Sequence, residues 1–192
     1  MTEIHPLQPF LPPNAVLLML GSFPPKQNRW SMEFYYPNMQ NDMWRIFGLI
    51  FFHDKDHFLR VNGKSFDKEK IIAFLKEKGI ALSDTATEVI RQKDNASDKH
   101  LDVVTPVDLH AMLAQIPECR AIAVTGQKAM DTILTLIDAA EPKVGDYSEF
   151  TFEGREMRLY RMPSSSRAYP KPIKTKAESY AKMFHEVLLF NH

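Results

Sequence analysis

The sequence has few of the features that would suggest a disulfide framework, a redox centre or a membrane anchor. Its 192 residues include one cysteine, Cys119, which excludes an internal disulfide and argues against a cysteine-ligated zinc or iron–sulfur site. No run approaches about 18 consecutive apolar residues, the length that a membrane-spanning helix needs. The first ten residues lack the basic-then-apolar layout of a signal peptide. We therefore expect a cytoplasmic protein with no membrane partner.

An excess charge of either sign is also missing, since 24 Lys and Arg residues balance 24 Asp and Glu residues. At the level of the whole chain this balance gives no sign of a polyanionic partner. The charges are unevenly distributed, however. The segment 155–182 holds eight basic residues against Glu156 and Glu178, a local charge of +6. Such a segment is either a solvated face or a phosphate-binding surface.

Several sequence motifs of cofactor and hydrolase sites are absent as well. The seven histidines are scattered, without the i, i+4 spacing and downstream ligand of a zinc site. The sequence 126–128 lacks the earlier glycine of a phosphate-binding loop, and Ser164 lacks the Gly-x-Ser-x-Gly elbow of an esterase. We expect no metal and no cofactor.

The composition is that of a globular protein, with 44% hydrophobic and 25% charged residues. A chain of this length fits one domain, residues 1–192, and we expect a monomer. Apolar runs closed by small residues predict buried strands at 15–20, 79–82, 121–124 and 157–162. Helical patterns lie at 67–78, 106–116, 127–140 and 175–190. The segment 150–155 resembles a hairpin arm, and the polar segment 91–100 is expected to be the least ordered.

Strands that alternate with helices predict an α/β fold: a three-layer α/β/α sandwich with a central, mainly parallel, four-stranded sheet. Ligands of such sheets bind outside the carboxyl ends of the strands. Small or polar residues follow all four predicted strands, at 21–25, 83–85, 125–128 and 163–167. Any one of these segments could be rich in Gly, Pro and Ser because it is a turn.

The segment 34–44 is unusually aromatic and also carries two asparagines. Its rings could belong to a satellite of the core or could form a stacking platform for a nucleobase. Asn41 and Asp42 precede an apolar helical pattern, so either of them could do no more than cap that helix.

Four of these stretches recur together in one protein family. They are Leu20-Gly21-Ser22-Phe23-Pro24, the segment from Tyr35 to Trp44, Gly79-Ile80-Ala81-Leu82-Ser83-Asp84, and Met162-Pro163-Ser164-Ser165-Ser166. The four stretches occur in the order of the family, and through them the chain resembles the uracil-DNA glycosylase superfamily, most closely its hypoxanthine-DNA (deoxyinosine) glycosylase branch. The resemblance spans nearly the whole chain.

The resemblance implies an enzyme of base excision repair. It would be a monofunctional DNA glycosylase, an N-glycosyl hydrolase that flips uracil or hypoxanthine out of damaged DNA and hydrolyses the N-glycosidic bond. Asn41 would position the attacking water. Asp84 could accept a hydrogen bond from the ring N–H of the base, act as a general base, or only cap a helix.

The remaining site residues are implied in two groups. The base would be bound by Ser22, Phe23, Pro24 and Tyr36, and the DNA backbone by Gly21, Ser164, Ser165, Ser166 and Arg167. The first of the four stretches departs from the family pattern, with Pro25 following Pro24 and no acidic residue in the loop. An alternative therefore stays open, a non-catalytic protein of the same fold that binds nucleic acid or a nucleobase.

Overall fold

The computed structural model describes residues 1–93 and 98–188. Its strands are β1 (Thr2–Ile4), β2 (Leu17–Gly21), β3 (Ile80–Asp84), β4 (Ala86–Arg91), β5 (Leu101–Pro106), β6 (Ala121–Thr125), β7 (Tyr147–Phe152) and β8 (Arg155–Met162). Its helices are α1 (Met43–Phe52), α2 (Lys68–Lys78), α3 (Leu109–Gln115), α4 (Gln127–Ile133) and α5 (Ile173–Leu188), with short 3-10 turns η1 (Gln27–Arg29) and η2 (Asp98–His100). The α/β class is confirmed.

The central sheet has five strands in the order β3-β2-β6-β8-β7. Neighbours among the first four run parallel, whereas β7 runs antiparallel to β8. The prediction of a four-stranded sheet is therefore wrong. Glu153 and Gly154, both at positive φ, form a two-residue turn between β7 and β8, the geometry that a tight hairpin needs. The hairpin arm expected at 150–155 thereby becomes the edge strand of the sheet.

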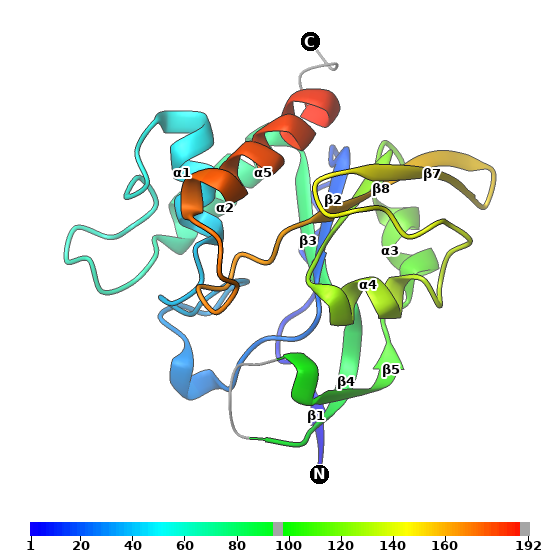
Figure 1. Cartoon of the computed structure of the whole chain (residues 1–192), viewed down its shortest axis with the longest axis horizontal. Helices are drawn as coiled ribbons and strands as arrows, with labels where there is room; N and C mark the ends of the chain where they lie inside the picture. Colours follow the sequence, from blue (N-terminus) through cyan, green and yellow to red (C-terminus); the bar gives the residue numbers. More distant parts are fainter. Residues whose placement is uncertain (94–97, 189–192) are drawn as a thin grey trace.

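Helices cover both faces of this sheet, because successive strand residues point to opposite sides. Leu17 and Met19 of β2 pack in one apolar cluster with α1, α2 and α5. Leu18 and Leu20 pack in a second cluster with α3 and α4. Figure 1 shows the resulting layers, with α1, α2 and α5 on one side of the strands and α3 and α4 on the other.

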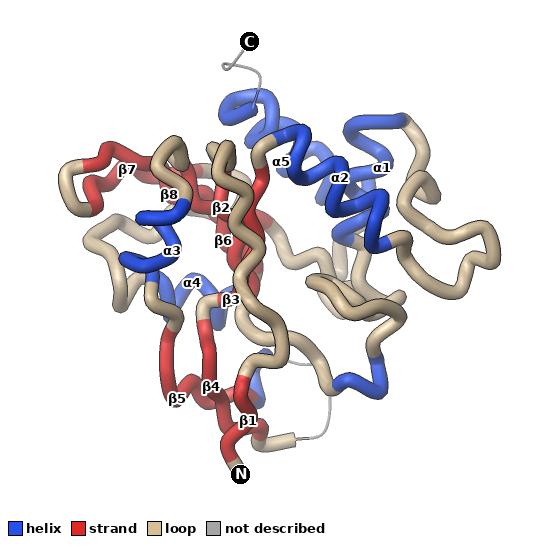
Figure 2. Tube along the Cα trace, turned by 180° about the vertical axis from the view of Figure 1, so that it is seen from behind, coloured by secondary structure: helices blue, strands red, loops and turns tan. Residues whose placement is uncertain are grey.

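A second sheet, of order β1-β4-β5, was not predicted. All its neighbours are antiparallel, and in Figure 2 it lies at the end of the molecule where the N-terminus is found. The prediction of a helix starting at Pro106 is wrong, because Pro106 ends β5 and pairs with Ala86. Helix α3 begins at Leu109, where Asp108 accepts a hydrogen bond from the Ala111 amide at 3.0 Å.

Other element bounds also differ from the prediction. Helix α4 ends at Ile133, so the expected extension to residue 140 is wrong. Helix α5 runs to Leu188, and residues 189–190 of the predicted helix lie outside the described residues. The expectation about segment 91–100 falls partly on residues 94–97, which also lie outside the described residues. None of the described helices is long and apolar enough to cross a membrane.

Candidate functional site

A cavity of about 300 Å³ lies at the carboxyl ends of the parallel strands. Its lining includes every residue that the sequence analysis assigned to a site: Gly21, Ser22, Phe23, Pro24, Tyr36, Asn41, Asp84, Ser164, Ser165, Ser166 and Arg167. The sheet accounts for this convergence, because β2, β3 and β8 are parallel and the loops that follow them meet at one edge. Pro25, Arg29 and Thr125 also line the cavity.

The loop after β2 begins at a close approach between Gly21 and Asp84. The two residues are register partners in the parallel pair β2–β3. A Cβ atom on Gly21 would lie 2.7 Å from Oδ1 of Asp84, which is closer than such atoms can pack. Only glycine therefore lets this carboxylate lie against the wall of the cavity.

The side chain of Phe23 packs mainly against the second sheet. It is 8% exposed and packs with Ala86, Val89 and Leu101 of the second sheet. Arg91 of that sheet donates a hydrogen bond to the Pro24 carbonyl at 3.0 Å. The second sheet thus holds the first loop in place, and the backbone amide is the hydrogen-bond donor that Phe23 can offer to the cavity.

The aromatic segment before α1 is anchored in the core at one side and borders the cavity at the other. Trp44 is fully buried and donates its indole N–H to the Tyr35 carbonyl at 3.0 Å. The Tyr35 hydroxyl donates to the Gln8 carbonyl at 2.8 Å, and burial raises the pKa of that phenol above its usual value. Tyr36 packs edge-on against Trp44. Its backbone has a φ of 52°, a left-handed conformation that residues other than glycine seldom adopt. This conformation leaves Tyr36 on the cavity wall.

Asn41 and Asp42 have different partners. The Asn41 side-chain oxygen accepts a hydrogen bond from the Met43 amide at 3.0 Å, so it satisfies one free donor of the first turn of α1. An amide oxygen has two lone pairs, and this contact uses one of them. Oδ1 of Asp42 instead accepts from Arg45 at 2.9 Å and from Arg167 at 3.1 Å.

Asp84 is the last residue of β3 and is held by a histidine that was not predicted to belong to the site. Its Oδ2 lies 2.6 Å from Nε2 of His5, and both side chains are 9% exposed. No helix follows Asp84, because Thr85 leads directly into β4. The alternative that Asp84 is a helix cap is therefore wrong.

The loop after β8 is clamped against the segment before α1. The Asp42 amide donates to the Ser165 carbonyl at 2.8 Å, and the Arg167 amide donates to the Gln40 carbonyl at 3.0 Å. Lys176 of α5, only 1% exposed, donates to the Ser166 carbonyl at 2.8 Å. Ser165 also belongs to the cavity lining but is only 2% exposed, so Ser164, Ser166 and Arg167 are the more accessible residues of this loop.

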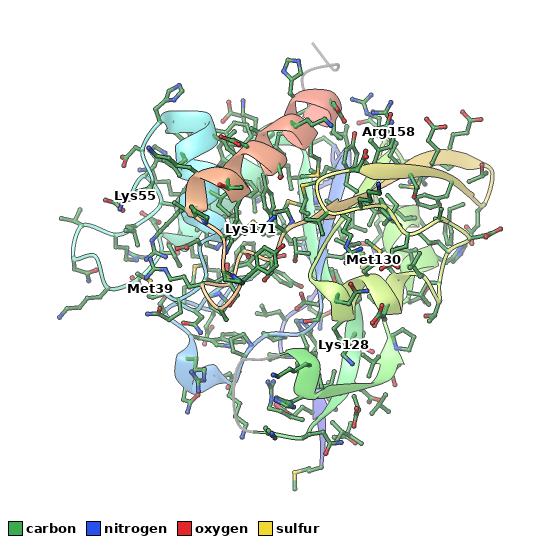
Figure 3. The ribbon with its side chains drawn as sticks, in the orientation of Figure 1. Met39, Lys55, Lys128, Met130, Arg158 and Lys171 are labelled. Carbon is green, nitrogen blue, oxygen red and sulfur yellow. The ribbon has the colours of Figure 1, made fainter. Side chains whose placement is uncertain are left out.

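The basic segment 155–182 is not one phosphate-binding surface. Arg155 donates to carbonyl groups at the end of α3, and Arg161 donates to the Pro142 carbonyl and pairs with Glu141. Arg158 lies over the Tyr147 ring and donates to the Tyr160 hydroxyl. Figure 3 shows Arg158 well away from Lys171, which lies on the loop before α5. Together with the buried Lys176, four of the eight cations are therefore engaged in the fold, and Arg167 is the one of the eight that lines the cavity.

Three residues of this neighbourhood escaped sequence reasoning: His5, Arg29 and Lys176. None of them belongs to a recognisable motif. His5 is 79 positions from Asp84 and Lys176 is ten from Ser166, so only the folded chain brings the partners together. The heptad-like spacing of α5 could have placed Lys176 on its buried face beside Ala177 and Tyr180.

Among the described residues, no cluster of three or more His, Cys, Asp or Glu side chains could hold a metal ion. Cys119 is 1% exposed, and burial raises the pKa of its thiol to about 11. Such a thiol stays protonated near neutral pH and is not a nucleophile.

No family model and no curated protein matches this sequence. A solved structure does match it. The solution NMR structure of a protein from Methanosarcina acetivorans, a candidate uracil DNA glycosylase, aligns over 97% of this chain and 99% of its own, with a TM-score of 0.69 and 22% identity. The two chains share a fold. At this identity the likeness concerns the arrangement of the elements, and the chemistry has to be argued from the cavity itself.

Proposed function

We propose that this protein is a DNA glycosylase that excises a deaminated base, uracil or hypoxanthine, from DNA. The observation that carries the proposal is the convergence of four segments, far apart in the sequence, on one cavity of about 300 Å³ at the carboxyl ends of the parallel strands. These four segments are the ones through which the sequence resembles the uracil-DNA glycosylase superfamily. The fold shared with the Methanosarcina protein supports the same assignment.

The size and walls of the cavity suit a single nucleobase. A volume of about 300 Å³ lies at the lower end of the range for ligand pockets. Tyr36 offers an aromatic face on which a flipped base can stack, and the backbone amides of Ser22 and Phe23 can donate to a base carbonyl. The Asp84 carboxylate only accepts hydrogen bonds. It would recognise the ring N–H that uracil and hypoxanthine carry and that cytosine and adenine lack at the same position.

The reaction needs water and no further reactant. The water oxygen bonds to C1′ of the deoxyribose while the bond from C1′ to the base nitrogen breaks. The electron pair of that bond leaves with the base, and a proton from the water neutralises the base or passes to solvent. Asn41 would orient the water through the second lone pair of its side-chain oxygen, while donors in the cavity stabilise the departing anion.

The rim of the cavity supplies contacts for the DNA backbone. Ser164 and Ser166 offer hydroxyl groups, and Arg167, whose side chain is 47% exposed, offers a cation fixed on one side by Asp42. Arg29 of η1 lies on the same rim. Contacts of this kind hold a flipped nucleotide without reading the sequence.

The same geometry favours a monofunctional enzyme over one that also cleaves the strand. Strand cleavage of that kind uses an amine nucleophile to form a Schiff base with the sugar. Among the described residues, no lysine lines the cavity. The nearby Lys176 is buried, and its Nζ donates to the Ser166 carbonyl.

A second candidate is a binding protein that keeps the pocket without turnover. The contact between Asn41 and the Met43 amide favours it, because that contact occupies one lone pair of the water-positioning oxygen. Pro25 favours it too, because proline has no backbone N–H to offer to a ligand.

Duplexes that carry uracil, hypoxanthine or an undamaged base test the proposal. Each is incubated with excess protein, and abasic sites are cleaved with alkali. We expect strand breaks at uracil, at hypoxanthine or at both, and intact undamaged strands. Intact strands for every lesion, together with salt-sensitive binding to the same duplexes, would support the binding protein instead.

A further inference from the structure

His5 makes two side-chain hydrogen bonds that together determine its tautomer. The Leu7 amide donates to Nδ1 of His5 at 3.0 Å, so Nδ1 carries a lone pair and no proton. The ring proton therefore lies on Nε2, which donates to Oδ2 of Asp84 at 2.6 Å. His5 in this state is a neutral donor aimed at the carboxylate.

The backbone around His5 is held on both sides. The His5 amide donates to the Thr87 carbonyl at 2.8 Å, which extends the pairing of β1 with β4. A few residues later, Phe10 exchanges two backbone hydrogen bonds with Leu82 of β3, which ties the chain after His5 to that strand. The imidazole ring also packs edge-on against Phe23, with centroids 5.1 Å apart. His5 therefore has little freedom to move away from Asp84.

The two oxygens of Asp84 consequently have different surroundings. Oδ2 is occupied by His5. Oδ1 lies over the α-carbon of Gly21, where a Cβ atom would be 2.7 Å from it, on a wall that Gly21, Tyr36 and Asp84 share. A carboxylate held in this way cannot rotate to exchange its oxygens without losing the histidine.

We propose that His5 is a positioning residue for base recognition: it orients Asp84 so that Oδ1 alone faces the flipped base, as an acceptor. This inference rests on the proposed function only in taking a nucleobase as the ligand. Oδ1 of Asp84 then accepts a hydrogen bond from a base with a ring N–H, and it repels a base whose ring nitrogen carries a lone pair at that position. The discrimination depends on the N-terminal segment, which none of the four family-like stretches includes.

The test measures binding and does not depend on turnover. The probes are two duplexes with a 2′-fluoro-2′-deoxyuridine, one normal and one methylated at N3, because the fluorine slows cleavage of the glycosidic bond. Methylation removes the N–H that Oδ1 would accept. We expect the wild-type protein to bind the unmethylated duplex about ten- to a hundredfold more tightly, the range for a hydrogen bond to a charged acceptor.

Three variants separate positioning from packing. His5→Phe keeps a ring beside Phe23 and removes the donor, and His5→Ala removes the donor without adding volume. In both, the preference for the unmethylated duplex should fall to within about threefold of unity, because the carboxylate is no longer held. His5→Gln, which carries an N–H at a similar reach, should recover most of the preference. Thermal melting identifies which variants are folded.

Two results would overturn the inference. One is a folded His5→Phe or His5→Ala protein that keeps the wild-type preference. The other is a wild-type protein that binds both duplexes equally, which would show that Asp84 does not read the N–H. A protein that discriminates between the duplexes and never releases a base would contradict the glycosylase proposal and leave the role of His5 standing.

Discussion

At the scale of single residues, the cavity depends on contacts that leave no room for a larger atom. Gly21 and Asp84 are register partners, and the missing side chain of Gly21 is the space that Oδ1 of Asp84 occupies. Gly21 is a site residue because of what it lacks. The sequence places Gly21 directly after the predicted strand 15–20, and the resemblance assigns it to the DNA backbone. Only the structure shows that the Asp84 carboxylate lies over it.

Gly21→Ala should therefore displace the Asp84 carboxylate. We expect base excision to fall at least tenfold, since a displacement of about 1 Å in a catalytic site costs a factor of that order or more. Single-turnover excision from a uracil or hypoxanthine duplex measures the effect. The matched control compares Asp84→Ala with the double variant Asp84→Ala, Gly21→Ala. Because the carboxylate is already absent, the added methyl group should reduce excision little further. Independent, additive losses would contradict the contact.

Asn41 has a structural partner and a proposed catalytic one, and the two roles can be separated. Asn41→Ala removes the acceptor of the Met43 amide, so the free energy of unfolding should fall by about 1 kcal/mol and excision should fall at least a hundredfold. Asn41→Ser keeps an acceptor for the helix but is too short to hold the water. It should unfold like the wild type in urea and lose activity like Asn41→Ala. A serine variant with wild-type activity would assign Asn41 to the helix alone.

At the scale of elements, the sequence predicts the buried strands well because both faces of each are covered. The apolar run 15–20 needs only its length and its closing small residues to indicate β2. Strand β4 is mostly half-buried and β5 is mostly exposed, and neither has such a run. They form because β4 pairs with β1 on one side and with β5 on the other. Pairing between distant segments leaves little trace in a local sequence pattern. The helix expected at 106–116 is present as α3, but it begins only at Leu109, because Pro106 belongs to the unpredicted strand β5.

The candidate site was predictable where it follows strand ends and not where it depends on packing. Loops at 21–25 and 163–167 could be placed at one sheet edge from topology alone. His5 and Lys176 support that edge from other elements, and no spacing rule connects them to it.

Helix α5 supports the site through a buried lysine, which has a consequence for stability. Burial lowers the pKa of Lys176 below its usual value. At pH values between the folded and the unfolded pKa of Lys176, the unfolded chain binds more protons than the folded chain. The contribution of Lys176 to the free energy of unfolding therefore rises with pH in this range and is lowest at neutral pH. Urea unfolding of the wild type and of Lys176→Met, from pH 7 to 10.5, should show that this rise is smaller in the variant.

Lys174→Met is the matched control for that comparison. Lys174 lies on the same helix and is exposed, so its replacement should leave the pH dependence unchanged. Lys176→Met should also weaken the binding of an abasic duplex, because the Ser166 carbonyl loses its anchor. A pH profile identical to the wild type in both variants would contradict the assigned burial effect.

At the scale of the whole molecule, a net charge of zero does not argue against DNA binding. The few cations on the rim of the cavity can contact phosphates whatever the net charge of the chain. Arg155, Arg158 and Arg161 are engaged in the fold, whereas Arg167 and Arg29 lie on the rim of the cavity. DNA binding should therefore be only modestly sensitive to salt, with a small number of phosphate contacts.

Arg167→Ala should reduce the slope of log K against log salt by about one and weaken binding to every duplex alike, because a phosphate contact carries no sequence information. Arg158→Ala removes the same charge from the same segment and should change neither quantity, since Arg158 lies over Tyr147. Fluorescence anisotropy of an abasic duplex over a range of salt concentrations measures both. Equal effects of the two variants would mean that the charge of the segment acts as a whole.

The proposal as a whole depends on whether a base leaves the DNA. The most direct measurement is the release of free uracil or hypoxanthine from a labelled duplex, followed by chromatography under single-turnover conditions with excess protein. The account predicts release by the wild-type protein, with an alkali-labile site left behind, and a loss of at least a hundredfold in Asn41→Ser. No released base from either duplex, by a folded protein that binds both, would contradict it.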